Sequence, residues 1–154
     1  MIVTIGGPAN TGKTTLGQWL NKQLDWPVVK LDYSAIAYRR QHKAMTTPTH
    51  PDKPGWLGRV ILEIIERGEL EQLFDLIRSE VSDPGIIEGQ FVGRHVWKSH
   101  AMTGWAQAIE KRLKPIPLIR FYTKPGFQIF HNDIPNPLNK EDVLRLIREA
   151  INAG

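Results

Sequence analysis

Residues 7–14, Gly-Pro-Ala-Asn-Thr-Gly-Lys-Thr, follow the pattern G-x-x-x-x-G-K-[ST] and constrain the fold of this chain more than any other stretch. The run at 1–5, rich in β-branched residues, predicts a short strand before the loop, and residues 15–20 predict the opening of a helix after it. The loop therefore has the strand–turn–helix setting that the pattern requires. We expect a sheet with this helix packed on it.

The composition of the loop predicts a phosphate site. Gly7 and Gly12 allow the backbone to curl, so that several N–H groups point into one concavity at the positive end of the helix. Lys13 is expected to reach the β- and γ-phosphates of a nucleotide, and Thr14 to place its hydroxyl on Mg²⁺. The alternative is a glycine-rich turn without a ligand. The predicted nucleotide-binding residues are Gly7, Asn10, Thr11, Gly12, Lys13, Thr14 and Thr15.

Length and composition favour one domain, residues 1–154. Hydrophobic residues make up 41% of the chain and charged residues 23%, as in an ordinary globular protein, and no apolar run approaches the ~18 residues that cross a bilayer. The absence of cysteine excludes disulfides and thiolate metal sites, and the first residues predict a strand, not a signal peptide. We therefore expect a cytoplasmic protein without membrane contact.

The formal net charge is +4, and the Lys and Arg residues are scattered along the chain. A basic balance suits a protein that holds triphosphates, and no basic stripe indicates a dedicated nucleic-acid surface. A nucleic-acid partner therefore stays an alternative that is not favoured. The five histidines are dispersed, and none has the H-x₃-H or H-E-x-x-H spacing of a metal site.

The loop is followed by a predicted strand–helix–strand unit. Leucines recur at every fourth position from 16 to 24, and Trp19 is expected to join this apolar stripe of the first helix. Residues 27–31 predict a second strand, so the sheet begins as a parallel one. Asp32 stands at the carboxyl end of that strand, where the ligand crevice of an open α/β sheet lies. We expect Asp32 to face the crevice that holds Lys13.

The middle of the chain combines a basic helix, a loop and core helices. Residues 34–44 predict a helix that carries Arg39 and Arg40. Residues 46–58 hold three prolines and two glycines and predict a mobile loop over the substrate side. Two core helices are predicted after it, at 59–66 and 69–81.

A third strand is predicted at 86–92, and in it Glu88 precedes a glycine. A carboxylate at the end of a buried strand is costly unless a cation is near, and a Mg²⁺–nucleotide complex would supply one. Glu88 is therefore expected to hold Mg²⁺ through water. The alternative is a surface acid at a strand end.

The last third of the chain predicts a helix from about residue 101 that ends before Pro115, and a fourth strand at 116–122. The connector that follows is too short for a parallel crossover, so residues 127–130 form either an antiparallel edge strand or no strand. Asn139, with an aspartate three residues later, is expected to cap a final helix.

Three places in the chain resemble the P-loop kinases of small molecules, most closely the uridine kinase and nicotinamide riboside kinase group: GPANTGKTTL at 7–16, KLDY at 30–33 and IIEG at 86–89. The resemblance implies an α/β fold, a P-loop kinase-like three-layer sandwich with a mostly parallel sheet and helices on both faces. It also implies that Asp32 is the base that accepts the proton of the attacking hydroxyl. In similar kinases a loop before the last helix packs on the adenine, and residues 131–135 lie at the corresponding place.

The chain departs from this group after the fourth strand. Similar kinases usually carry an arginine-bearing lid there, and here the segment shrinks to residues 123–126. Either the lid is missing, or Arg94 and Lys98, or Arg39 and Arg40, supply the charge that stabilises the transition state. For Arg39 and Arg40, a solvated helix face is an equal alternative.

The function predicted first is transfer of the γ-phosphoryl group of Mg-ATP to a hydroxyl of a nucleoside-like small molecule, with Asp32 and Lys13 as catalytic residues. A nucleoside monophosphate kinase and a polynucleotide 5′-hydroxyl kinase are alternatives of the same class. A lidless P-loop module that binds or hydrolyses ATP is the alternative from another class. The expected substrate contacts are Tyr33, Arg39, Arg40 and Arg94.

Overall fold

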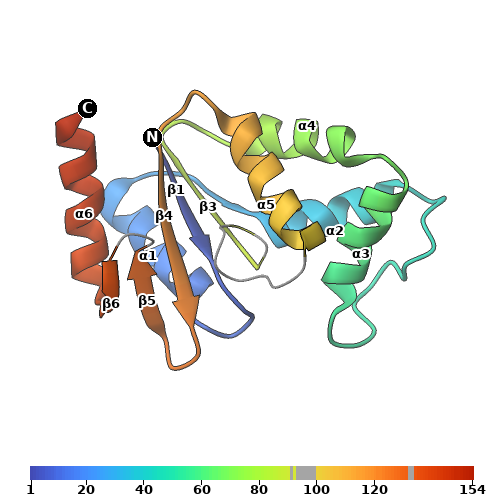
Figure 1. The fold of residues 1–154 in the computed structure, drawn as a ribbon, viewed down its shortest axis with the longest axis horizontal. Helices are drawn as coiled ribbons and strands as arrows, with labels where there is room; N and C mark the ends of the chain where they lie inside the picture. Colours follow the sequence, from blue (N-terminus) through green and yellow to red (C-terminus); the bar gives the residue numbers. More distant parts are fainter. Residues whose placement is uncertain (91, 93–99, 132–133) are drawn as a thin grey trace.

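The structure, a computed structural model of the chain, describes residues 1–90, 92, 100–131 and 134–154, with the backbone alone described at 100–106 (Figure 1). The described helices are α1 (Lys13–Leu24), α2 (Leu31–Gln41), α3 (Trp56–Glu66), α4 (Leu70–Glu80), α5 (His100–Leu113) and α6 (Lys140–Ala153). The described strands are β1 (Ile2–Gly6), β2 (Val28–Lys30), β3 (Gly85–Gly89), β4 (Leu118–Lys124), β5 (Gln128–His131) and β6 (Ile134–Leu138).

The described strands form one sheet in the order β2-β3-β1-β4-β5-β6. β2, β3, β1 and β4 are parallel, whereas β5 is antiparallel to β4 and β6 is antiparallel to β5. The prediction of an α/β protein with a mostly parallel sheet is thus confirmed. The register places Glu88 of β3 between Ile5 of β1 and Lys30 of β2. Glu88 therefore lies close to the carboxyl end of the sheet, next to the loop that follows β1.

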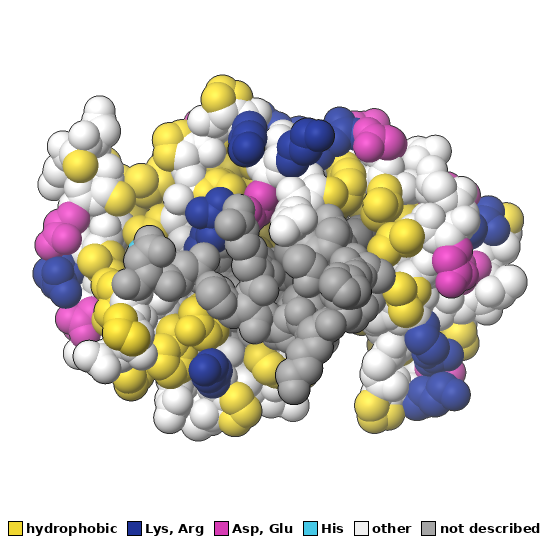
Figure 2. Space-filling view, in the orientation of Figure 1, with side chains coloured by type: hydrophobic (Ala, Val, Ile, Leu, Met, Phe, Trp, Pro, Cys, Tyr) yellow, Lys and Arg dark blue, Asp and Glu magenta, His cyan; other side chains and the backbone are white. Residues whose placement is uncertain are grey.

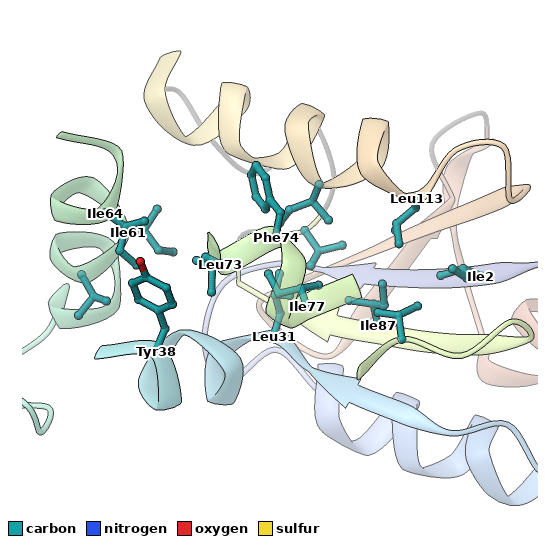
Figure 3. Packing of buried hydrophobic residues seen from close by; sticks show 14 of the residues in the cluster. Ile2, Leu31, Tyr38, Ile61, Ile64, Leu73, Phe74, Ile77, Ile87 and Leu113 are labelled. Carbon is teal, nitrogen blue, oxygen red and sulfur yellow. The ribbon is translucent and has the colours of Figure 1, made fainter. Parts of the chain in front are cut away.

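Alternating side chains of the strands supply two cores, one on each face of the sheet. Ile2 and Ile87 pack with residues of α2, α3, α4 and α5, a core that Figure 3 shows from close by. Val3 and Ile86, the neighbours of Ile2 and Ile87 in their strands, point to the opposite face and pack with α1 and α6. Helices thus cover both faces (Figure 1), which is compatible with a three-layer sandwich. Within the described ranges, no helix is both long and apolar enough to span a bilayer.

Two helices begin earlier than the sequence predicts. α2 begins at Leu31, directly after the three residues of β2, so Asp32 lies in its first turn and not in a loop after the strand. A carboxylate there complements the positive end of the helix. α3 begins at Trp56, three residues before the predicted start at residue 59. Gly55, with φ at 84°, ends the preceding loop there.

The strands differ from the prediction in several places. β4 lies two residues later than the predicted 116–122, at Leu118–Lys124. β3 ends at Gly89 and not at residue 92. β5 is antiparallel, but it lies inside the sheet, because β6 covers its outer edge. β6 itself was not predicted, since Pro135 and Pro137 argue against a strand. Proline is tolerated here because β6 is an edge strand with no neighbour on its outer side.

The loop predicted at 46–58 is irregular as far as residue 55, and hydrogen bonds fasten the part nearest α2. Arg39 was predicted to contact substrate or solvent, but its side chain is buried. Its guanidinium donates to the backbone carbonyls of His42, Met45 and Thr47. Arg39 therefore holds this loop against α2, and we correct its assignment from substrate contact to loop anchor.

Glu63 on α3 holds the same loop from the other side. Its carboxylate accepts hydrogen bonds from the backbone N–H and the hydroxyl of both Thr46 and Thr47. Burial alone would raise the pKa of Glu63, but these bonds outweigh burial and lower the pKa to about 2. The ionised carboxylate therefore stabilises the folded loop.

We expect Glu63→Gln to weaken the acid dependence of stability. Because the pKa of Glu63 is lowered to about 2 in the folded state, its contribution is fully present above the unfolded pKa and is lost as the pH falls towards 2. Urea titrations at pH 7 and pH 3 measure the free energy of unfolding. The wild type should lose more stability between these pH values than Glu63→Gln. Glu66→Gln, an exposed position of the same helix, is the matched control, and equal losses in wild type and Glu63→Gln would refute the assignment.

Candidate functional site

The glycine-rich loop between β1 and α1 bends at positions of positive φ: Gly7 at 140°, Asn10 at 62° and Gly12 at 94°. Gly12 is the N-cap residue of α1, and no side chain among the described residues caps the helix there. The first N–H groups of α1 thus lack a side-chain acceptor, at the positive end of the helix dipole. Such an end binds anions.

Strand β4 holds this loop in place through Thr123. The Thr11 hydroxyl donates to the Pro8 carbonyl at 2.7 Å and lies 2.5 Å from the Thr123 hydroxyl, which also reaches the Gly6 carbonyl at 3.3 Å. Gly7 packs directly on this threonine, since a Cβ atom at position 7 would overlap the Thr123 hydroxyl and stand 2.5 Å from its carbonyl oxygen. The loop can approach β4 this closely only because residue 7 has no side chain.

We expect Gly7→Ala to lower the free energy of unfolding by about 1–3 kcal/mol beyond the strain of its positive φ, because the overlapping atoms include backbone that cannot rotate away. Gly55→Ala is the matched control: φ is 84° there, yet no atom lies within 4 Å of the added Cβ. The control therefore measures the strain of positive φ alone, about 1–2 kcal/mol. Urea denaturation compares the two variants, and an equal loss in both would contradict the tight contact between the loop and β4.

Lys13 crosses the inside of the loop. Its side chain is buried, and its Nζ donates to the Pro8 carbonyl at 2.6 Å. Burial lowers the pKa of Lys13, while the negative charges of Asp32 and Glu88 oppose this shift. The structure therefore places Asp32 and Glu88, predicted from separate strand ends, within electrostatic reach of the lysine.

Asp32 is held against the end of β3. Its Oδ1 accepts a hydrogen bond from the backbone N–H of Gln90 at 3.2 Å. A Cβ atom at Gly89 would stand 3.1 Å from the same oxygen, so the glycine makes room for the carboxylate. Burial raises the pKa of Asp32, while the Gln90 hydrogen bond and Lys13 act in the opposite direction. A raised pKa makes the carboxylate a stronger base than that of a free aspartate.

Glu88 has an open oxygen in a buried position. Its side chain is 4% exposed, and its Oε2 has no hydrogen-bond partner among the described residues. A buried carboxylate oxygen without a partner is costly unless a cation lies beside it. Thr14 is exposed at the start of α1, where it lines a polar pocket with Lys13. Carboxylate and hydroxyl oxygens are the kinds of ligand that a hard divalent cation such as Mg²⁺ takes.

Two pockets flank the start of α1. The polar pocket has a volume of about 300 Å³ and is lined by Asn10, Gly12, Lys13, Thr14, Thr15 and Phe127. The apolar pocket has a volume of about 240 Å³ and is lined by Thr11, Gly12, Thr15, Leu16, Trp19, Phe127, Ile129 and Lys140. The two pockets share Gly12, Thr15 and Phe127. A ligand with an anionic end and an aromatic end could therefore occupy both.

Neither pocket is lined by Gly7, Asp32 or Glu88, although Asp32 and Glu88 lie within electrostatic reach of Lys13. Three further predicted site residues also line neither pocket. Tyr33 is 63% exposed, lies under the Lys30 ammonium and lines a pocket along β2. Arg39 is the loop anchor described above. Arg40 is exposed and lies 3.1 Å from a ring nitrogen of His50.

The segment in which a lid was expected is a tight hairpin. β4 and β5 pair directly, and residues 125–127 connect them, so no further element stands between these strands. Arg94 and Lys98, predicted as substitutes for a lid arginine, lie outside the described residues. Residues 132–133 of the predicted adenine contact at 131–135 also lie outside them, and β6 begins at the next residue.

The sequence reasoning missed four residues of the site: Thr123, Phe127, Trp19 and Lys140. Trp19 was assigned to the apolar stripe of α1, and it does pack partly on the second core, but it also forms a wall of the apolar pocket. Residues 127–130 were expected to form either an antiparallel edge strand or no strand, and Phe127 occupies the turn before β5, with φ at 57°. An aromatic residue next to a glycine in a short connector was the only signal, and it indicates a turn, not a ligand.

No known family model matches the chain. The interpretation of the site therefore depends on its own geometry: an uncapped helix start, one buried lysine, two carboxylates and two adjoining pockets. These groups come from α1, α2 and β3, and the sheet brings them to its carboxyl edge. They can bind an anionic ligand, hold a divalent cation and accept a proton.

We expect Asp32→Asn to raise the melting temperature of the ligand-free protein at pH 8. Because the pKa of Asp32 is raised in the folded state, its charge is disfavoured there, so stability falls as the pH rises through the unfolded pKa towards the folded one. The difference between variant and wild type should shrink at pH 4.5, where more of Asp32 is protonated. Asp25→Asn, at the exposed end of α1, is the control. A melting temperature that falls at pH 8 would contradict the burial cost.

Proposed function

We propose that this chain is a P-loop kinase-like phosphotransferase, which moves the γ-phosphoryl group of Mg-ATP to a hydroxyl of a nucleoside-like small molecule. The observation that carries the proposal is the convergence of Lys13, Asp32 and Glu88 beside the uncapped start of α1. Ligands of open α/β sheets bind at the carboxyl ends of the strands, where these groups meet. Buried charges of this kind destabilise a fold and cluster at functional sites.

The triphosphate would lie in the polar pocket. Backbone N–H groups of the loop and of α1 would donate to its oxygens, with the helix dipole adding to the attraction. The Lys13 ammonium, which donates to the Pro8 carbonyl without a ligand, would turn to the β- and γ-phosphates. The partly compensated charge of Lys13 favours an anion, because burial disfavours the lysine's charge unless a counter-charge is near.

Thr14 and Glu88 would hold Mg²⁺, in agreement with the open Glu88 oxygen and the exposed threonine in the polar pocket. When bound, Mg²⁺ neutralises charge on the β- and γ-phosphates as the phosphoryl group is transferred. Gly17 supports this geometry, since a Cβ atom at that position would lie 3.7 Å from Glu88 Oε2. The helix thus brings its backbone close to the carboxylate.

In the proposed reaction, the acceptor's hydroxyl oxygen forms a bond to the γ-phosphorus while the bond from that phosphorus to the bridging oxygen breaks. The electron pair leaves on the β-phosphate oxygen, which gives ADP. Asp32 accepts the hydroxyl proton on its carboxylate. Because the Gln90 N–H already donates to Oδ1 of this carboxylate, the other oxygen would be the one that accepts the proton.

A second candidate is an ATP-binding module or ATPase that needs no acceptor, and the hairpin between β4 and β5 favours it. The connector at 125–127 carries no arginine, and no arginine among the described residues lines either pocket. An arginine that stabilises the transition-state charge contributes about 10³–10⁵-fold in rate. A chain without one would transfer phosphate slowly or need a partner to complete the site.

The alternatives of the kinase class differ in how well the charges suit them. A nucleoside monophosphate acceptor needs cationic groups, and the Arg39 guanidinium is already used by backbone carbonyls. A polynucleotide acceptor needs a basic track, whereas Lys and Arg stand in separate groups on the face drawn in Figure 2. A small hydroxyl acceptor makes neither demand.

The proposal is tested by ADP release from Mg-ATP across nucleosides, deoxynucleosides, their monophosphates and a 5′-hydroxyl oligonucleotide. We expect acceptor-dependent release from the wild type and background release from Lys13→Ala. Asp32→Asn should bind ATP within about threefold of the wild type but lose about 10²–10⁴-fold in turnover, the range for general-base catalysis. Turnover should also fall below the raised pKa of Asp32, since the protonated carboxyl cannot accept a proton.

Lys22→Ala and Asp25→Asn are matched controls, because both side chains are exposed on α1 or at its end, away from the pockets. Both should retain full activity. ADP release that ignores every acceptor would support the ATPase and overturn the kinase. Full turnover by Asp32→Asn would show that Asp32 is not the base.

A further inference from the structure

Phe127 divides the two pockets at the start of α1. It occupies the turn between β4 and β5, is 73% exposed and has φ at 57°, a conformation that phenylalanine rarely adopts. Its ring lies on Gly12, since a Cβ atom there would stand 2.9 Å from Phe127 Cδ1. The ring of Phe127 therefore contacts the loop although most of it is exposed to solvent. The backbone conformation at this turn is one that glycine adopts more easily than phenylalanine.

The apolar pocket beyond Phe127 offers stacking surfaces but few groups that could recognise the edge of a ring. Phe127 supplies an exposed aromatic face, Trp19 supplies an aromatic wall that Lys140 partly covers, and Leu16 and Ile129 supply aliphatic contacts. The Thr11 hydroxyl is used by Pro8 and Thr123. No Asn, Gln, Asp or Glu side chain among the described residues lines the pocket.

Lys140 at the start of α6 supplies the pocket's one charged side chain among the described residues. Its Nζ lies 5.1 Å from the centroid of the Trp19 ring, over the face of the indole. A lysine has three rotatable donors and no acceptor, so it can meet a ring nitrogen or a carbonyl oxygen of many bases. It therefore adds attraction without selecting one base.

We infer that the chain binds the base of its phosphate donor by stacking in the apolar pocket, with Phe127 as the contact that sets affinity, and so accepts purine and pyrimidine triphosphates alike. This inference rests on the proposed function and specifies its donor class. A site that hydrogen-bonds a particular polar group rejects ligands without it by about 10⁴–10⁵-fold, whereas an apolar pocket discriminates by about 10²-fold or less. Stacking tolerates every base because every base has a π-face.

The test measures dissociation constants by calorimetry, with Mg²⁺ present, for ATP, GTP, CTP, UTP, inorganic triphosphate and adenosine. We expect ATP and GTP to bind the wild type within about threefold of each other and the two pyrimidine triphosphates within about tenfold of ATP, because a smaller ring stacks less. Inorganic triphosphate, which lacks a base, should bind more weakly than any of the four.

Phe127→Ala should weaken all four nucleoside triphosphates by about tenfold and leave inorganic triphosphate unchanged, since stacking contributes about that much per base. Phe127→Tyr keeps the aromatic face and should restore wild-type affinity. Leu62→Ala, which removes an exposed apolar side chain of α3, is the matched control and should change nothing. Melting curves verify that each variant is folded.

The outcomes separate this inference from the proposed function. The inference is overturned if ATP binds the wild type more than 100-fold tighter than GTP does. It is also overturned if Phe127→Ala binds ATP with the affinity of the wild type. Either result leaves the kinase proposal standing. If adenosine binds and Phe127→Ala weakens its binding, while no triphosphate binds, the kinase proposal is overturned and the apolar pocket is supported as a base-binding site. Failure of every ligand to bind overturns both.

Discussion

The contact between Thr11 and Thr123 is the interaction on which the candidate site depends. It joins the loop after β1 to the neighbouring strand β4, and Gly7 permits the close approach. The loop's course in turn fixes Lys13, whose ammonium is held across the loop at the Pro8 carbonyl. β4 also leads into the turn that presents Phe127 to the start of α1. One strand therefore positions both Lys13 and Phe127.

The charged part of the site acts against the stability of the fold. Burial lowers the pKa of Lys13 and raises that of Asp32, because it disfavours the charged form of each group. The attraction between the two charges offsets only part of this cost. Glu88 adds a buried oxygen without a partner among the described residues. The buried Glu110 of α5, by contrast, has a partner: Arg120 on β4 donates two hydrogen bonds to it, of 2.8 and 2.9 Å. Groups left charged and uncompensated in this way are more common at functional sites than in a protein core.

Much of the fold could be predicted because local pattern and tertiary structure agree. The glycine-rich loop, the parallel strand–helix–strand start and the capping box of Asn139 and Asp142 are local signals, and each stands where predicted. β6 could not be predicted, because its prolines are tolerated only at an edge that the sheet order creates. Arg39 was misassigned since a basic helix face is normally solvated, and only the folded loop supplies the carbonyls that bury it.

The sequence by itself determined the loop's chemistry, the α/β class and the position of acidic residues at two strand ends, because these follow from residue type and from spacing along one segment. Only the tertiary structure decided that Thr123 holds the loop, that Phe127 divides two pockets and that Trp19 and Lys140 line one of them. These contacts join residues more than a hundred positions apart. The periodicity of the sequence cannot predict contacts between such distant residues, because they arise from the order of the strands in the sheet.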